Sequence, residues 1–157
     1  MKFIGLLLIA ASLMYLPAAA QKADKSEKQF LKAINEVLRK SPHQHWNYEG
    51  NKMTIDSAFR ISKDRVISVT VRYKTDSSFY RVRMAAPFDE IQDVMQDIYI
   101  IFQFDSKLVQ VYESEPNSEV LKPAYRLSLL HVGMPDEGDE KTLPKVQRLF
   151  AGVVNPN

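Results

Sequence analysis

The chain has 157 residues, no cysteine and a formal net charge of +2 at neutral pH. The lack of cysteine excludes disulfides, thiol catalysis and thiolate metal sites. The near-neutral charge argues against nucleic acid as an electrostatic partner. The length fits one ordinary domain with a core of its own.

Residues 1–20 predict a secretory signal peptide. A basic start at Lys2 precedes an apolar run over 3–16, and a stretch of small alanines ends at Ala20. Signal peptidase reads small residues at that place, so we expect cleavage after Ala20. This leaves 21–157 as a single globular α+β domain, periplasmic or secreted, with no membrane span. The alternative is a leader retained as an anchor, because the apolar stretch is just long enough to cross a bilayer.

An amphipathic helix is predicted over residues 24–40. Asp24 is expected to cap its start, and Pro42 ends it because the residue before a proline disfavours helical backbone. The spacing i, i+4, i+7, i+8 gives one apolar face, which consists of Phe30, Ile34, Val37 and Leu38.

Between about residues 46 and 133 the apolar residues alternate with a period of two. This pattern is typical of antiparallel strands with one buried face. Residues 87–97 interrupt it and are expected to form a short helical turn over the sheet. The expected strands cover 53–62, 67–73, 80–84, 98–105, 108–114 and 125–132, with a short seventh at 45–49.

A second amphipathic helix is predicted over 141–154, with Thr142 as its cap and Pro144 in its first turn. The order of helix, six to seven antiparallel strands and helix predicts an α+β fold. Both helices must bury their apolar faces against the inner face of the sheet. A curved sheet or small barrel, with the C-terminal helix packed on it, satisfies this requirement.

The strands and final helix over 46–154 resemble the topology of the pleckstrin-homology-like superfold. The segment 88–94 looks like the acidic and apolar connector of such domains. The leader that ends at Ala20, followed by a helix-plus-strands body, is similar to small exported proteins of Bacteroidetes type. Neither resemblance assigns an activity to particular residues, because one superfold hosts many functions.

Four polar clusters favour structural roles over chemistry. His43 and His45 have no third metal ligand at a suitable spacing, and His131 has no nucleophile motif beside it. The acidic run 136–140 lacks the order of a calcium loop. The carboxylates of 89–97 are adjacent on one turn rather than across a cleft. We therefore predict no metal, no cofactor and no enzymatic activity.

The predicted binding surface is basic. Arginine forks bind phosphates and carboxylates, and lipid headgroups, lipopolysaccharide phosphates and acidic glycans are the anions of a cell envelope. The alternative is a solvated sheet face on which the arginines pair with Asp56 and Glu113. Four arginines share the polar parity of the first three long strands and are expected to cluster on one outer face: Arg60, Arg72, Arg81 and Arg83.

The expected function is an exported, non-enzymatic binding or interaction module of the bacterial cell envelope. Its expected partner is an envelope protein, an anionic lipid headgroup or an acidic glycan, and not a nucleic acid. Phe79 and Tyr99 fall on the outer parity and are expected to be exposed, where they would suit such a partner. Two alternatives remain, a small barrel that carries an apolar ligand and a small hydrolytic enzyme.

Overall fold

The computed structural model describes residues 17–155. Most of the predicted leader, 1–16, lies outside the described residues. The expected α+β fold is confirmed, with eight antiparallel strands rather than six or seven. In chain order the elements are α1 (Pro17–Lys40), η1 (Trp46–Tyr48), β1 (Lys52–Ile61), β2 (Val66–Lys74), β3 (Phe79–Pro87), η2 (Phe88–Glu90), β4 (Asp93–Gln96), β5 (Ile100–Gln103), β6 (Val109–Ser114), β7 (Leu121–Leu127), β8 (Leu129–Gly133) and α2 (Thr142–Val154).

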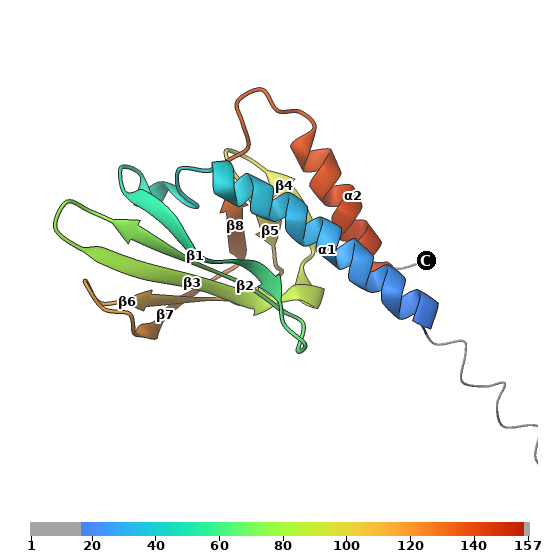
Figure 1. Cartoon of the computed structure of the whole chain (residues 1–157), viewed down its shortest axis with the longest axis horizontal. Helices are drawn as coiled ribbons and strands as arrows, with labels where there is room; N and C mark the ends of the chain where they lie inside the picture. The colour runs from blue at the N-terminus through green and yellow to red at the C-terminus, as the bar shows by residue number, and fades with distance from the viewer. Residues whose placement is uncertain (1–16, 156–157) are drawn as a thin grey trace, which may run out of the picture.

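The strands form two separate sheets. One has the order β1-β2-β3-β6-β7 and the other the order β4-β5-β8. Helix α1 runs across the molecule, and α2 lies beside it (Figure 1). Of the two expected forms, a curved sheet or a small barrel, the closed barrel does not occur among the described residues, because the chain passes from β7 in one sheet to β8 in the other at Ser128. The described residues therefore offer no barrel interior for an apolar ligand.

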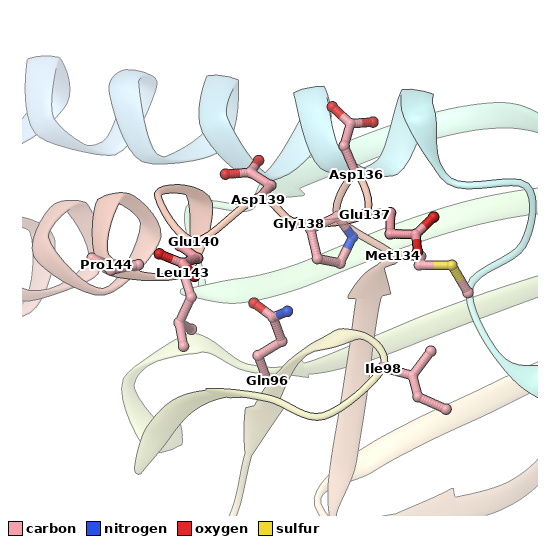
Figure 2. A pocket seen from close by; sticks show the side chains of 11 residues that line it. Gln96, Ile98, Met134, Asp136, Glu137, Gly138, Asp139, Glu140, Leu143 and Pro144 are labelled. Carbon is pink, nitrogen blue, oxygen red and sulfur yellow. The ribbon is translucent and has the colours of Figure 1, made fainter.

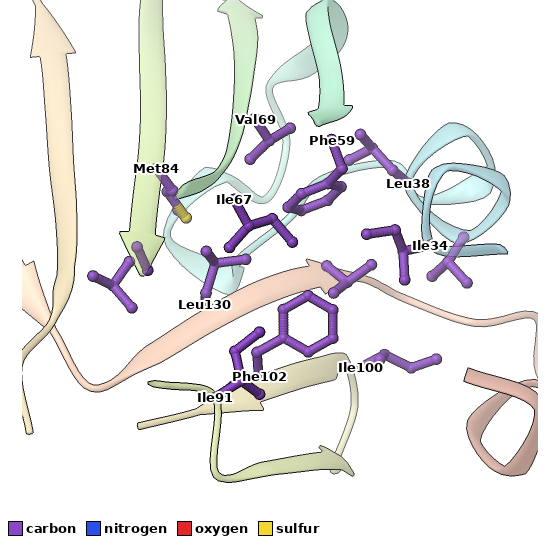
Figure 3. Close-up of a cluster of buried hydrophobic side chains, with 14 of the residues drawn as sticks. Ile34, Leu38, Phe59, Ile67, Val69, Met84, Ile91, Ile100, Phe102 and Leu130 are labelled. Atoms are coloured by element: carbon purple, nitrogen blue, oxygen red, sulfur yellow. The ribbon is translucent and has the colours of Figure 1, made fainter. Parts of the chain in front are cut away.

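The core fills the space between α1 and the two sheets. Phe30, Ile34 and Leu38 on α1 are fully buried. They face Ile67 from the first sheet and Phe102 from the second, as Figure 3 shows for most of this cluster. Burial of one such side chain contributes roughly 1.5–3 kcal/mol. The predicted apolar face of the first helix is thus the part that holds the two sheets together.

One buried amide ties α1 to the edge of the larger sheet. The Asn35 side chain donates to the Phe59 carbonyl at 3.0 Å and accepts from the Phe59 backbone nitrogen at 2.8 Å. Strand β1 is an edge strand. Without Asn35, the buried N–H and C=O of Phe59 would therefore lack hydrogen-bond partners. The contact therefore pairs both Phe59 backbone groups and covers this part of the β1 edge.

Several local expectations are wrong. The short helical turn expected within 87–97 occurs only at η2, and residues 93–96 instead form β4 and pair with β5. Residues 125–132 are split between two strands of different sheets. The expected strand at 45–49 is a 3-10 turn. Tyr99 is only 4% exposed, because it packs against histidine rings rather than facing solvent.

The two helix starts also differ from expectation. Helix α1 already includes Pro17, the first described residue, so Asp24 lies inside the helix rather than at its start. At α2 the capping acceptor is Asp139, whose carboxylate accepts from the backbone nitrogens of Lys141 at 2.9 Å and Thr142 at 3.1 Å.

Candidate functional site

The outer face of the larger sheet carries a row of aligned residues that crosses all five strands. Residues directly opposite each other in paired strands project to the same face, and the pairing register runs without a break from one edge to the other. With strands about 4.8 Å apart, the row spans about 19 Å. Its members are Arg60, Ser68, Ala85, Gln110 and Arg126.

The next register position adds a third arginine to this face. Arg83 lies opposite Thr70 on one side and Tyr112 on the other. Its guanidinium carbon lies 5.8 Å from the centre of the Tyr112 ring, a distance at which the charge is attracted to the ring face. Arg60, Arg83 and Arg126 therefore surround a patch of small and polar side chains.

These three arginines have no carboxylate partner in the described part of the chain. Arg126 donates through Nε to the Gln110 side-chain oxygen at 3.0 Å, and Arg83 has only its ring contact. Arg60 has no hydrogen bond or ion pair to any residue within 17–155. We call these residues the open arginines. An unneutralised guanidinium retains its full capacity to bind an anion.

Arg72 and Arg81 are also on this face, opposite each other, but they are neutralised. Both guanidinium groups contact Asp56, at 3.1 Å and 2.6 Å, and both contact Glu119. Hydrogen bonds to these two carboxylates raise the pKa of Arg72. Burial works to raise the pKa of Asp56, but hydrogen bonds from the two arginines outweigh it and leave that pKa below its ordinary value.

The four predicted arginines thus share one face but divide into two kinds. The expected pairing with Asp56 occurs, whereas Glu113 contacts tyrosine hydroxyls instead. Sequence reasoning missed Arg126. The alternation of Tyr125, Arg126 and Leu127 indicates that Arg126 faces the opposite side of the strand from its two neighbours. Which of the two sides is the outer face depends on how β7 pairs with β6, and the local sequence does not show this pairing.

Two hydroxyls lie between the open arginines without partners of their own. Ser68 is 5% exposed and Thr70 is 7% exposed. Neither hydroxyl bonds another residue in the part of the chain that the structure describes. Neither oxygen is among the fully buried polar atoms without a partner in the described residues, so both hydroxyls keep contact with solvent. A bound group with donors and acceptors could take the place of that solvent.

The three histidines form a second polar cluster, at the other end of β2. The rings of His45 and His131 meet edge to face at 4.6 Å between centres, and His43 contacts the Tyr99 hydroxyl at 3.1 Å. Burial lowers the pKa of His131 to about 4 and also lowers the pKa of His45. Asp97 opposes both shifts. No group of three or more metal-ligating side chains occurs among residues 17–155.

An open hollow of about 560 Å³ lies between the acidic loop, β4 and the start of α2 (Figure 2). Ile98 and Leu143 contribute its apolar lining. Two of its carboxylates already have structural partners, because Asp136 pairs with Lys40 and Asp139 caps α2. The acidic run therefore braces the loop between β8 and α2.

No helix within the described range 17–155 has the length and apolar character needed to cross a membrane. Comparison with protein-family models, with curated proteins and with solved structures finds no match. The fold and the outer face therefore define the class on their own. The chain is an α+β protein with two antiparallel sheets and a partly neutralised arginine surface.

Proposed function

We propose that the protein is an exported, non-enzymatic binding module of the bacterial cell envelope, and that the open arginines bind an acidic glycan. The observation that carries this proposal is the absence of any carboxylate partner, within 17–155, for Arg60, Arg83 and Arg126. The other arginines on the same face are neutralised by two carboxylates.

The spacing of the open arginines favours an extended polyanion over a single small anion. Arg60 and Arg126 stand at opposite ends of a row about 19 Å long, and Arg83 lies between them on the central strand. A linear glycan with one carboxylate per sugar presents charges at repeated intervals over such a length. One phosphate would reach one or two of the three guanidinium groups.

The groups between the arginines suit a sugar better than a lipid headgroup. The hydroxyls of Ser68 and Thr70 can exchange hydrogen bonds with sugar hydroxyls, whereas the Gln110 amide nitrogen already donates to the carbonyls of Val111 and Tyr125. Binding to a membrane surface is normally helped by inserted apolar side chains. The large exposed apolar side chains among the described residues, which do not belong to the arginine row, are Ile98, Val120, Tyr125 and Val154.

The test uses fluorescein-labelled oligogalacturonate, a chain of carboxylated sugars, titrated with the purified protein and followed by fluorescence anisotropy. Unlabelled oligogalacturonate should displace the probe, and neutral dextran of similar length should not. Vesicles of phosphatidylglycerol provide the lipid alternative. Absence of binding to oligogalacturonate, or binding to the vesicles alone, would overturn the assignment.

A further inference from the structure

The neutralised pair, Arg72 and Arg81, binds two carboxylates that differ in their position in the fold and in their exposure to solvent. Asp56 belongs to β1 and its side chain is 19% exposed. Glu119 belongs to the loop between β6 and β7 and its side chain is 60% exposed. Asp56 is thus a fixed part of the sheet face, whereas Glu119 reaches the arginines from outside.

Glu119 sits on the arginine pair as a bound carboxylate would. One of its oxygens lies 2.8 Å from Arg72 Nη1 and the other 3.1 Å from Arg81 Nη1. Arg81 Nη1 also donates to the Glu119 backbone carbonyl at 2.9 Å. Arginine guanidinium groups commonly bind carboxylates in proteins, because their planar array of N–H donors matches the carboxylate oxygens.

The structure also supplies the means for Glu119 to leave. The loop is attached to the sheet two residues before Glu119, where Asn117 exchanges hydrogen bonds with the Phe79 backbone at 2.8 Å and 3.1 Å. Beyond that point Val120 is 64% exposed, so no apolar packing holds the segment down. The Glu119 side chain is 60% exposed, although the two arginines are only 20% and 22% exposed, so water reaches this carboxylate and competes for its ion pairs. The Phe79 ring lies 4.5 Å from the Arg72 guanidinium carbon and holds that group in place.

The neutralised pair also lies within reach of the open arginines. Arg81 and Arg83 are two positions apart on β3 and project to the same face, which separates them by about 7 Å along the strand. One acidic glycan bound at Arg83 would therefore bring a neighbouring carboxylate close to Glu119.

We propose that Glu119 is a built-in competitor, which occupies a carboxylate-binding site made by Arg72 and Arg81 until a glycan carboxylate displaces it. This inference rests on the proposed function and deepens it, because it adds a second, regulated subsite to the same face. The exchange of one carboxylate for another leaves the two guanidinium groups neutralised. It therefore needs no rearrangement of the sheet.

The test compares Glu119→Gln with Glu115→Gln in the oligogalacturonate titration. Glu115 lies in the same loop but pairs with the exposed Lys122, so both substitutions remove one negative charge from one segment. Glu119→Gln should tighten binding about three- to tenfold because the site is no longer filled, and Glu115→Gln should change it little. Arg81→Gln should abolish the gain when combined with Glu119→Gln and should have a smaller effect alone.

The possible results distinguish the competitor role of Glu119 from the proposed function. An equal gain in both loop variants means a bulk charge effect and overturns the competitor. No gain in Glu119→Gln overturns it too, while wild-type binding would leave the proposed function standing. Binding by Glu119→Gln without wild-type binding supports the competitor and removes the role of the open arginines. No binding by either protein rejects both proposals.

Discussion

His131 should make the protein less stable as the pH falls from 7.5 to 5. Its side chain is 6% exposed and packs against His45 and Tyr99. Burial, reinforced by the nearby His45, lowers its pKa to about 4, and only Asp97 acts in the opposite direction. In the unfolded chain its pKa is about 6.5.

The sign follows from where the proton binds. Between about pH 6.5 and pH 4 the unfolded state takes up a proton at His131 that the folded state does not, so stability rises with pH over this window. At pH 5 the difference amounts to about 2 kcal/mol relative to pH 7.5, and below pH 4 this histidine adds no further loss. His45 adds to the same trend, because its pKa is also lowered by burial.

Urea unfolding followed by far-ultraviolet circular dichroism at pH 7.5, 6 and 5 measures this loss. His131→Phe keeps a ring against Tyr99 but removes the titration, so most of the pH dependence should disappear. His43→Gln leaves the contact between His45 and His131 intact and should keep it. A wild-type protein whose free energy of unfolding is flat over this range, or a His131→Phe variant with the full wild-type slope, would refute the reasoning.

Two further predictions concern the fold. Asn35→Ala should lower the free energy of unfolding by about 1–3 kcal/mol in urea titrations, because it leaves both backbone groups of Phe59 unsatisfied; an unchanged midpoint would contradict the role given to this amide. Gly133→Ala should also destabilise, since a Cβ there would lie 2.9 Å from the Ser41 Cβ, whereas Gly152→Ala in the open interior of α2 should stabilise by about 0.5–1 kcal/mol. Similar thermal midpoints for these two glycine variants would show that the close approach at Gly133 is absent.

Much of the fold was predictable because its elements follow simple periodicities. The buried face of α1 and the alternation along β2 and β3 were visible in the sequence. What failed depended on pairing between distant segments. Nothing local shows that the chain changes sheets at Ser128, and the apolar spacing in 93–96 suits a helix as well as a short strand.

The candidate site shows the same division. Parity placed Arg60 and Arg83 on one face, as the structure has them. Pairing of the arginines with Asp56 was foreseen as an alternative, but the second carboxylate on Arg72 was not, because Glu119 is 47 positions away and reaches it through a loop. Nor could parity show that Arg126 completes the row, because this requires the order of the strands in the sheet.

The proposed binding surface is tested by replacing the three open arginines together by glutamine and measuring the affinity for oligogalacturonate. If each contributes about 0.5 kcal/mol, the triple variant of Arg60, Arg83 and Arg126 should bind about tenfold more weakly. A matched triple variant of Lys32, Arg39 and Arg148, which removes the same charge from exposed helix positions, should bind nearly as the wild type does. Equal weakening in both variants, or none in the first, would contradict a binding surface on the outer sheet face.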